Sequence, residues 1–303
     1  MGGFIVEFVF RGAPTRVSLL ASFLLLGSAA FADTSINPSN QYAYGANSGW
    51  ITARADLTNG AVIGSFFCSG YLYGANVGWI SLGQYPTNGF RYSNAGAQDF
   101  GVNHDGLGRL SGYAWGQNIG WIAFETNGNP RVDLLTGRMD GYAWGQNVGW
   151  ISLSNNALAY VQTDYLSTGN DKDEDGIPDP WEFSNAPDLE TLGPYPADAD
   201  EDGVPDGDEY LADTDPRDEG IFLRITSVAR QSPTNLITWT VQPTRFYRLE
   251  QTDLLTNGAA WTESGLGLLA PPANFDPTLT ALVTEPSVTT RFYRAKAVIP
   301  LSP

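Results

Sequence analysis

The chain has 303 residues, of which 42% are hydrophobic and 13% aromatic, so it is long enough for two or three domains and too apolar to be disordered throughout. Its net charge is −17, and 20 of its 33 acidic residues lie between residues 164 and 219, beside only two basic residues. Such a local negative field repels nucleic acid and anionic membranes and attracts cations.

Residues 1–32 are typical of an export signal. Arg11 and Arg16 precede an apolar run at 17–26, and residues 30–32 have the small-x-small pattern of a signal peptidase site. The run is short for a bilayer span of about 20 residues, so cleavage before Asp33 is predicted rather than an uncleaved anchor. We therefore expect a secreted or cell-surface protein with no transmembrane segment in its mature chain.

Residues 33–157 contain four copies of the pattern Y-x-[YW]-G-x-N-x-G-W-I, at 42–51, 71–80, 113–122 and 142–151. In each copy, two short aromatic runs flank Gly and Asn residues that can take positive φ, which predicts a β-hairpin. We expect an all-β domain of stacked or radially arranged hairpins. The pattern leaves open whether this domain closes like a propeller or stays open like a solenoid.

The aromatic rings of these repeats allow two interpretations. We favour the first, in which the rings form the core and each Asn shapes its own turn. In the second, rings such as Trp115 and Trp144 stack on sugars while Asn118 and Asn147 bond to hydroxyl groups, as in a carbohydrate-binding module.

The acidic segment, 158–219, contains a twelve-residue pattern twice. Calcium prefers about six to eight oxygen ligands, which such a loop offers as carboxylates at positions 1, 3, 5, 9 and 12 and a carbonyl at position 7, with a glycine turn at position 6. The sequence therefore predicts about two calcium ions. The predicted ligands are Asp171, Asp173, Asp175, Ile177, Asp179 and Glu182 in one loop and Asp198, Asp200, Asp202, Val204, Asp206 and Glu209 in the other.

The spacing of the two loops limits how closely they can resemble EF-hands. Only 15 residues, three of them proline, separate the two loops, so we expect short helices at 181–183 and 206–212 rather than a full EF-hand pair. The alternatives to calcium are a solvated acidic linker and magnesium. Magnesium suits a wrapping Asp-rich loop poorly because it demands a tighter octahedron and keeps its waters.

Residues 220–303 contain five β-rich runs separated by Pro, Gly and Asn clusters, which predict a β-sandwich. We place Trp239 and one ring of the Phe246–Tyr247 pair in its core. The runs cover 222–228, 236–241, 246–251, 279–283 and 291–298. Together with the hairpin repeats and the calcium-loop linker, they define an all-β multidomain fold.

The twelve-residue pattern resembles bacterial thrombospondin type 3 repeats, whose D-x-D-x-D-G-[IVL]-x-D units close on calcium. Residues 210–216 resemble the ending E-Y-x-x-G-T-D-P of those repeats, with Asp213 in place of Gly. The aromatic repeats resemble those of exported proteins of environmental bacteria, and the F-Y-R triplets at 246–248 and 292–294 are similar to fibronectin type III-like modules. These resemblances cover nearly all of the mature chain, and only the first carries a functional implication, calcium binding.

We find no motif typical of catalysis. His104, the only histidine, is predicted to lie in a turn, and no Ser or Cys nucleophile motif accompanies it. Cys68, the only cysteine, excludes an intramolecular disulfide, and its apolar neighbours predict a buried side chain. We therefore expect a calcium-binding, non-enzymatic surface, adhesion or structural protein, whose partners would be an extracellular glycan or another surface protein. The alternatives are the carbohydrate-binding module and an accessory protein of a secreted hydrolase.

Overall fold

The structure, a computed structural model, describes residues 34–55, 58–156, 159–231, 233–256, 259–284 and 290–302. The predicted export signal, including Arg11 and Arg16, lies outside these ranges. Strands dominate the described part, which holds two α-helices, α1 (Asp179–Asn185) and α2 (Asp206–Ala212), and the 3-10 helix η1 (Thr126–Gly128). The prediction of a mostly β chain is confirmed. None of the helices in these ranges has the length and apolar composition that crossing a bilayer requires.

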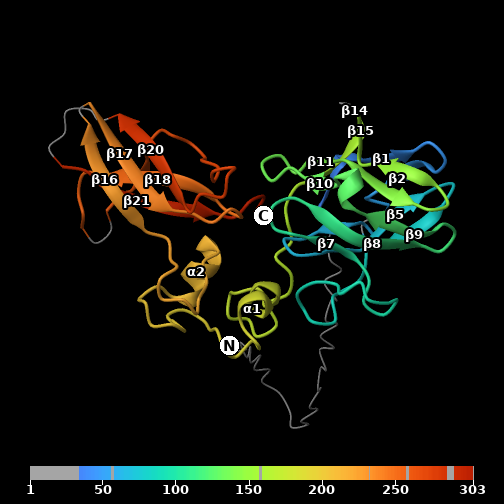
Figure 1. Cartoon of the computed structure of the whole chain (residues 1–303), viewed down its shortest axis with the longest axis horizontal. Coiled ribbons are helices and arrows are strands. Elements are labelled where there is room, and N and C mark those ends of the chain that lie inside the picture. The colour runs from blue at the N-terminus through green and yellow to red at the C-terminus, as the bar shows by residue number, and fades with distance from the viewer. Residues whose placement is uncertain are drawn as a thin grey trace, which may run out of the picture. The chain divides into compact units, whose positions relative to one another are not determined.

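The four aromatic repeats form four β-hairpins, which join into one closed, barrel-like antiparallel ring of eight strands (Figure 1). The ring is closed by β13 pairing with β1, where Tyr44 lies opposite Ser152. This closed ring is neither a propeller nor an open solenoid. Its strands, in hydrogen-bonded order, are β1 (Ile36–Gly45), β2 (Gly49–Thr52), β5 (Tyr71–Gly74), β6 (Gly78–Ser81), β8 (Leu110–Gly116), β9 (Gly120–Phe124), β12 (Tyr142–Gly145) and β13 (Gly149–Ser152).

Shorter strands pair at the margins of this ring. β14 and β15 extend it beside β1, and β7 pairs with β8. Two further pairs, β3–β4 and β10–β11, form small separate sheets. The bounds are β3 (Val62–Ile63), β4 (Cys68–Ser69), β7 (Val102–His104), β10 (Arg131–Val132), β11 (Met139–Asp140), β14 (Ser154–Asn156) and β15 (Ala159–Thr163).

The turns of the hairpins share one geometry. In three of them, the backbone N–H of Val77, Ile119 or Val148 donates to a glycine carbonyl three residues earlier, at 3.1 to 3.2 Å. In all four, the next residue is a glycine with φ between 74° and 77°. This fits the type I turn with a glycine bulge that closes three-residue hairpin loops, and it requires glycine because side chains disfavour that φ.

The repeat asparagines connect neighbouring turns into a circle. Each side-chain amide donates to a backbone carbonyl in the turn of the adjacent repeat, so the four bonds run once around the end of the ring. The asparagines therefore join turns of different repeats, whereas we expected each to shape only its own. The bonds are Asn47 to Val148 (3.2 Å), Asn76 to Ser48 (3.3 Å), Asn118 to Val77 (3.2 Å) and Asn147 to Ile119 (3.1 Å).

The inside of the ring is filled mainly by aliphatic residues, together with Phe124, and the aromatic rings of the repeat pattern point outward. Ala43 and Ile51 of the first repeat are buried, as are their equivalents Ala143 and Ile151 in the last. The tryptophans at 50, 79, 121 and 150 are between 42% and 49% exposed. The favoured expectation that the rings form the core is therefore wrong. Because side chains alternate along a strand, the narrow interior takes the Ala, Leu and Ile positions and the rings face solvent.

Two three-stranded antiparallel sheets follow the acidic segment, in the orders β16-β17-β20 and β19-β18-β21. Trp239 and Tyr247, one from each sheet, lie in one buried cluster, which confirms the predicted core positions. All five predicted runs overlap strands, and among the strands of the described residues here only the two-residue β19 was missed. The bounds are β16 (Ile225–Gln231), β17 (Thr234–Thr240), β18 (Phe246–Thr252), β19 (Thr262–Glu263), β20 (Thr278–Thr284) and β21 (Phe292–Val298).

Both residues that we considered for reactivity are buried in the repeat domain. Burial raises the pKa of the Cys68 thiol to about 12, so it stays protonated, as expected of a core side chain. His104 ends β7 and is fully buried, so its predicted place in a turn is wrong. Its Nδ1 lies 2.8 Å from the Gly64 carbonyl, and its Nε2 accepts from the Gly108 N–H at 3.1 Å. These partners fix a neutral ring with its proton on Nδ1.

We predict that Ser48→Val stabilises the ring. Ser48 stands where the other repeats have Val77, Ile119 and Val148, and it is fully buried with no hydrogen-bond partner for its Oγ. Replacing the unpartnered hydroxyl with a methyl group and adding a second methyl group should raise the free energy of unfolding by about 1 to 2 kcal/mol, measured by urea denaturation. The matched control, Val77→Ser, should lower it by a similar amount. A loss of stability in Ser48→Val would show that the four turns are not equivalent.

We also predict that His104 makes the protein less stable in mild acid. Burial lowers the pKa of His104, so the unfolded chain binds more protons as the pH falls through the ordinary value of about 6.5. The stabilisation is complete above this value and is lost below it, by about 1 kcal/mol at one pH unit lower. Urea unfolding at two pH values measures the loss. His104→Asn, whose amide can still donate to Gly64, should show a smaller pH dependence, and equal dependence in both chains contradicts the assignment.

Candidate metal centres

The two Asp-rich loops, 171–182 (the first loop) and 198–209 (the second loop), have the same backbone course. Each leads through a proline into a seven-residue helix, α1 or α2, that begins at loop position 9. The second helix has the predicted bounds, and the first is longer than predicted at both ends. The backbone φ is positive at positions 4 and 6 of both loops: 59° and 96° at Glu174 and Gly176, and 64° and 93° at Glu201 and Gly203.

Backbone N–H groups hold the carboxylates inside each loop. Asp171 accepts from the N–H groups at positions 5 and 6, at 3.2 and 3.1 Å, and Asp175 Oδ1 accepts from the Ile177 N–H at 2.8 Å. The second loop repeats this arrangement, since Asp198 accepts from position 6 at 2.9 Å and Asp202 from position 7 at 2.7 Å. Each loop thereby curls its own backbone around a group of acidic side chains.

Several carboxylate oxygens in these loops are buried without a hydrogen-bond partner. Seven of the thirteen such side-chain atoms in the described residues belong to the two loops. A buried, unpaired carboxylate is strongly unfavourable, so this concentration indicates a missing positive charge. The atoms are Asp175 Oδ2, Glu182 Oε1 and Oε2 in the first loop and Asp198 Oδ1, Asp200 Oδ2, Asp202 Oδ2 and Glu209 Oε2 in the second.

The glutamates at position 12 show the electrostatic consequence most clearly. Glu182 and Glu209 are both 0% exposed. Burial raises the pKa of Glu182 to about 8, and the negative charge of Asp175 adds to the rise. Burial likewise raises the pKa of Glu209 to about 8, although the hydrogen bond from Thr214 opposes it. Near neutral pH these carboxyls must therefore take up a proton or a cation.

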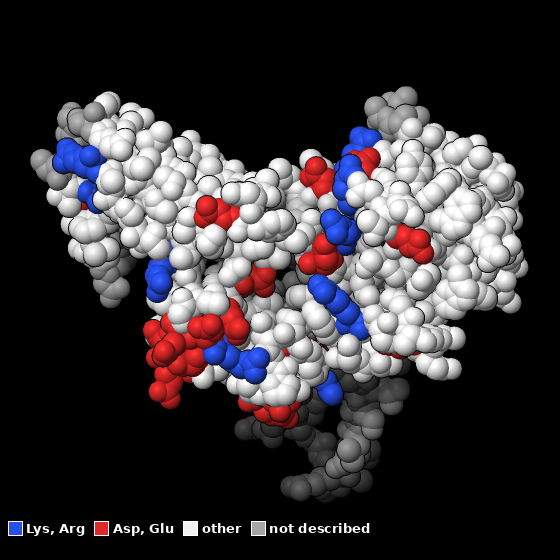
Figure 2. Space-filling view, in the orientation of Figure 1, with Lys and Arg blue, Asp and Glu red and all other residues white. Residues whose placement is uncertain are grey.

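Most of the predicted carboxylates lie in groups of three, from which Asp206 and Glu209 are absent. Oxygens of Asp173, Asp175 and Glu182 all lie within 4.8 Å of one another, as do those of Asp171, Asp173 and Asp179. A third group in the second loop comprises Asp198, Asp200 and Asp202. Two oxygens on one calcium ion, each at about 2.3 to 2.6 Å, are separated by no more than about 5 Å. Each loop can therefore hold a metal ion. Figure 2 shows the acidic side chains gathered in the region of α1 and α2, with few on the strand domains.

Positions 7 and 9 differ in part from the predicted ligand arrangement. Asp206 uses both oxygens to accept backbone N–H groups, from Ala199 at 2.8 Å and Gly193 at 3.0 Å. Asp179 accepts the N–H of Lys172 at 2.7 Å, yet it also belongs to one carboxylate group. The aspartates at position 9 therefore fix the backbone of their loops through these hydrogen bonds. At position 7, the Ile177 side chain is buried in a small apolar cluster with Trp181, as expected, whereas Val204 is half-buried.

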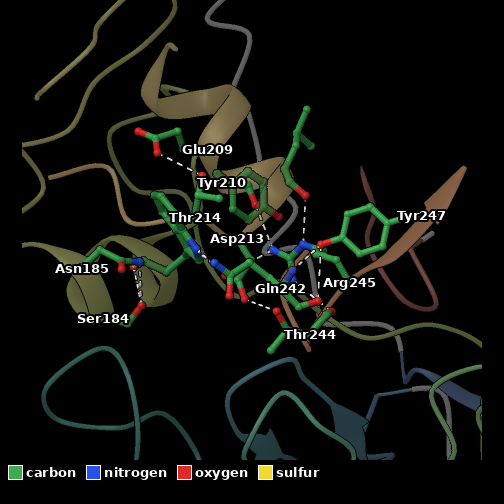
Figure 3. Close-up of polar contacts among 12 residues, drawn as sticks. Ser184, Asn185, Glu209, Tyr210, Asp213, Thr214, Gln242, Thr244, Arg245 and Tyr247 are labelled. Atoms are coloured by element: carbon green, nitrogen blue, oxygen red, sulfur yellow. Dashed lines mark hydrogen bonds and ion pairs between the residues drawn. The ribbon is translucent and has the colours of Figure 1, made fainter. Parts of the chain in front are cut away.

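Asp213 occupies the closing turn that the sequence left unexplained. It ends α2 with φ at 58°, the left-handed conformation that glycine usually supplies at this position. Its carboxylate accepts from the Trp181 indole N–H at 2.8 Å and from the Thr244 hydroxyl. Figure 3 shows Asp213 facing Thr244 and Arg245, whose guanidinium lies 3.5 Å away. Asp213 therefore connects the helix of the first loop to that of the second and to the strand region after residue 220.

Two partners of this network, Thr214 and Arg245, were not predicted from the sequence. The Thr214 hydroxyl donates to Glu209 Oε1 at 3.0 Å, which orients that carboxylate. Arg245 is buried and donates to the Leu211 and Tyr210 carbonyls, at 2.9 and 2.8 Å, at the C-terminal end of α2. The Thr-Asp-Pro ending signalled Thr214, but no local pattern links Arg245 to a helix more than 30 residues earlier.

Of the four residues predicted for sugar binding, the two tryptophans are exposed to a ligand and the two asparagine amides already have hydrogen-bond partners. Trp115 and Trp144 are exposed on the outside of the ring. The side-chain amides of Asn118 and Asn147 are instead bonded to neighbouring turns. Comparison with known proteins adds no assignment, because no family model, curated protein or solved structure matches the chain.

We predict that Asp213 stabilises the fold in two ways: its backbone adopts the left-handed turn, and its carboxylate accepts hydrogen bonds. Asp213→Ala should lower the free energy of unfolding by about 2 to 4 kcal/mol, because it strains the left-handed turn and leaves the buried Trp181 N–H unpaired. Asp213→Gly should cost about 1 kcal/mol less than Asp213→Ala, since glycine relieves the strain.

Asp213→Asn should be the mildest of the three, because asparagine tolerates this φ and keeps an acceptor oxygen. Urea denaturation with calcium present measures all three variants. Glu219→Gln removes an exposed acidic charge nearby and should have little effect. The same loss in the Ala and Gly variants would show that the turn is not strained.

Proposed function

We propose that the protein is an exported, non-enzymatic calcium-binding protein of the cell surface or the extracellular medium, with an adhesive or structural role. One observation carries this proposal: seven buried carboxylate oxygens without partners lie in two loops of matching conformation. Charge-compensating side chains are scarce, since Lys172 and Arg217 are the only basic residues between 164 and 219.

Calcium fits these loops better than other common cations do. Each loop offers carboxylates at positions 1, 3 and 5, a carbonyl at position 7 and a buried glutamate that can bind through both oxygens. This gives about six protein oxygens, with room for water, which matches the coordination that calcium prefers. Because the oxygens are hard donors and neither loop contains His or Cys, zinc and copper are disfavoured.

The aspartates at position 9 would help to form the calcium sites without all of them contacting the ion directly. In loops of this type, position 9 commonly reaches the ion through a water molecule. Asp206, with both oxygens held by backbone N–H groups, would fix the entrance of the second loop rather than contact the ion. Asp179 lies near Asp171 and Asp173 and would be the nearer of the two to an ion.

Calcium would act here mainly by ordering the acidic segment. Among the described residues of this segment, the buried apolar cluster consists of Ile177, Trp181, Ala186 and Leu192, which is small for so long and mostly polar a stretch. Two divalent ions would neutralise the clustered carboxylates and couple binding to folding. The segment would then be a firm connection between the hairpin ring and the C-terminal sheets, which we interpret as a fibronectin type III-like β-sandwich.

We predict that calcium raises the free energy of unfolding of the acidic segment. We also predict that Glu182→Gln stabilises the chain in chelator and destabilises it with calcium. At a calcium concentration about 100 times the dissociation constant, each ion should contribute about 2.7 kcal/mol, visible as a calorimetric transition that shifts to lower temperature with chelator. In chelator, Glu182→Gln should be more stable than the natural chain, because glutamine has no charge that must be neutralised when the side chain is buried. With calcium it should be less stable, because one ligand is lost.

Isothermal titration calorimetry separates the two loops. Glu182→Gln and Glu209→Gln should each leave one binding event, and the double variant none. Glu190→Gln, an exposed change between the loops, is the matched control and should bind two ions. A melting profile that does not change with calcium, or tighter binding of magnesium than of calcium, contradicts the proposal.

A further inference from the structure

The outer wall of the hairpin ring carries an aromatic surface that the proposed calcium sites do not use. Each repeat places three rings on this wall: two from its first strand and the tryptophan of its second strand. The tryptophans are Trp50, Trp79, Trp121 and Trp150. The rings directly opposite them across the hairpin are Tyr44, Tyr73, Trp115 and Trp144.

The rings of each triplet hold one another in place. Opposite rings have centroids 4.6 to 5.0 Å apart, and the third ring of each triplet meets its tryptophan edge-on at 6.0 to 6.3 Å. Such tilted and edge-to-face contacts fix the orientation of the rings before any ligand arrives. Trp115 and Trp144 nevertheless remain 38% and 41% exposed. The wall therefore presents rigid, partly open rings with phenol and indole groups as polar contacts.

The neighbours of the triplets keep them apart. On the outer face, the first-strand ring of one repeat lies opposite a small residue of the previous repeat. The pairs are Tyr73 with Thr52, Trp115 with Ser81, Trp144 with Ala123 and Tyr44 with Ser152. Triplets therefore recur every two strands, roughly 10 Å apart at the backbone, with a small side chain between them.

The wall is uncharged although the chain as a whole is strongly acidic. The eight ring strands contain no Asp, Glu, Lys or Arg, and neither do the three-residue loops that join them in pairs. Figure 2 shows the ring domain largely white, with few charged residues on the face in view. A membrane with anionic lipids or a nucleic acid would need basic residues on the contact surface. A neutral ligand with flat apolar faces and many hydroxyl groups needs none.

We propose that the outer wall of the ring binds a neutral, unbranched polysaccharide, with the aromatic triplets stacking on sugar rings. The repetition supports a polymer in particular, because four similar sites around the ring match a ligand with a repeating unit, although Phe100 also packs against Trp121 in the third triplet. Because the ring is closed, successive triplets face different directions, and a long polymer meets more than one of them by curving around the wall. Weak single contacts then combine through effective concentration. This proposal does not rest on calcium binding, since the triplets and the acidic loops share no residue.

Tryptophan fluorescence provides a direct test on the whole chain, because six of its nine tryptophans belong to the triplets. A soluble β-linked glucan, a mannan and chitin oligomers are titrated against the protein, with polygalacturonate as an anionic comparison. At least one neutral polymer should bind and protect the tryptophans from quenching by acrylamide. Failure of all neutral polymers, or binding of polygalacturonate alone, overturns the proposal.

Variants assign the binding to the wall. Trp115→Thr and Trp144→Thr keep strand-favouring residues, and we expect about threefold weaker binding for each and about tenfold for both. Leu135→Thr, exposed on the same domain outside the triplets, should bind normally. Circular dichroism checks that each variant is folded, and the quenching result on the natural chain stands even where one is not.

Chelator separates this proposal from the calcium sites. Glycan affinity should be unchanged in chelator, whereas loss of binding would move the sugar site to the acidic loops and overturn the assignment to the wall. Glycan binding that persists while calorimetry detects no calcium would instead contradict only the calcium proposal.

Discussion

The burial of two carboxylates without counter-charge is the constraint on which the middle of the molecule depends. Glu182 and Glu209 lie within the first turn of α1 and α2, and both are fully buried. An ionised carboxylate in such a place is tolerated only beside a positive charge or with its oxygens fully hydrogen-bonded. Neither glutamate is fully bonded, and neither pairs with a basic side chain within the described residues. The negative charge of these two glutamates is therefore not balanced by any basic side chain of the described residues.

The hairpin ring, in contrast, is stabilised by a buried apolar interior and by hydrogen bonds between its own strands and turns. Its interior is a continuous apolar cluster, and closure through β13 and β1 gives each of its eight strands a hydrogen-bonded neighbour on both sides. Four side-chain amides bridge successive turns, so that each repeat depends on the next. The ring contains everything its stability requires, whereas the acidic segment has a small core and an excess of one charge. We expect local opening to begin in the acidic segment when cations are removed, because the least protected units of a protein open first.

The sequence allowed part of this structure to be predicted. The hairpins, the turns of the Asp-rich loops, α2 and the core position of Trp239 follow from local rules: glycine and asparagine in turns, alternating carboxylates, and β-rich runs. The direction of the aromatic rings did not follow. Both faces of each repeat strand are apolar, with rings on one and Ala, Leu or Ile on the other, so alternation alone cannot choose the inner face. The choice depends on closure into a ring of eight strands, a property of all four repeats together.

The Asp213 network was missed for a related reason. The replacement of glycine by aspartate is visible in the sequence, but its partners Trp181 and Arg245 lie 32 residues on either side. A turn that only needs positive φ would keep glycine. The retention of a carboxylate there is explained by three donors that require an acceptor.

The outward rings also show how one feature can serve both stability and recognition. A strand of four residues makes few backbone hydrogen bonds, so cross-strand side-chain pairs carry much of its stability, and aromatic pairs are among the strongest. The interior of an eight-stranded ring has no room for twelve such rings, which leaves the outer wall as the only place for them. The exposed faces are then a consequence of how short hairpins are stabilised. A ligand that stacks on these faces meets rings that folding has already oriented, so binding orders little that is not ordered before.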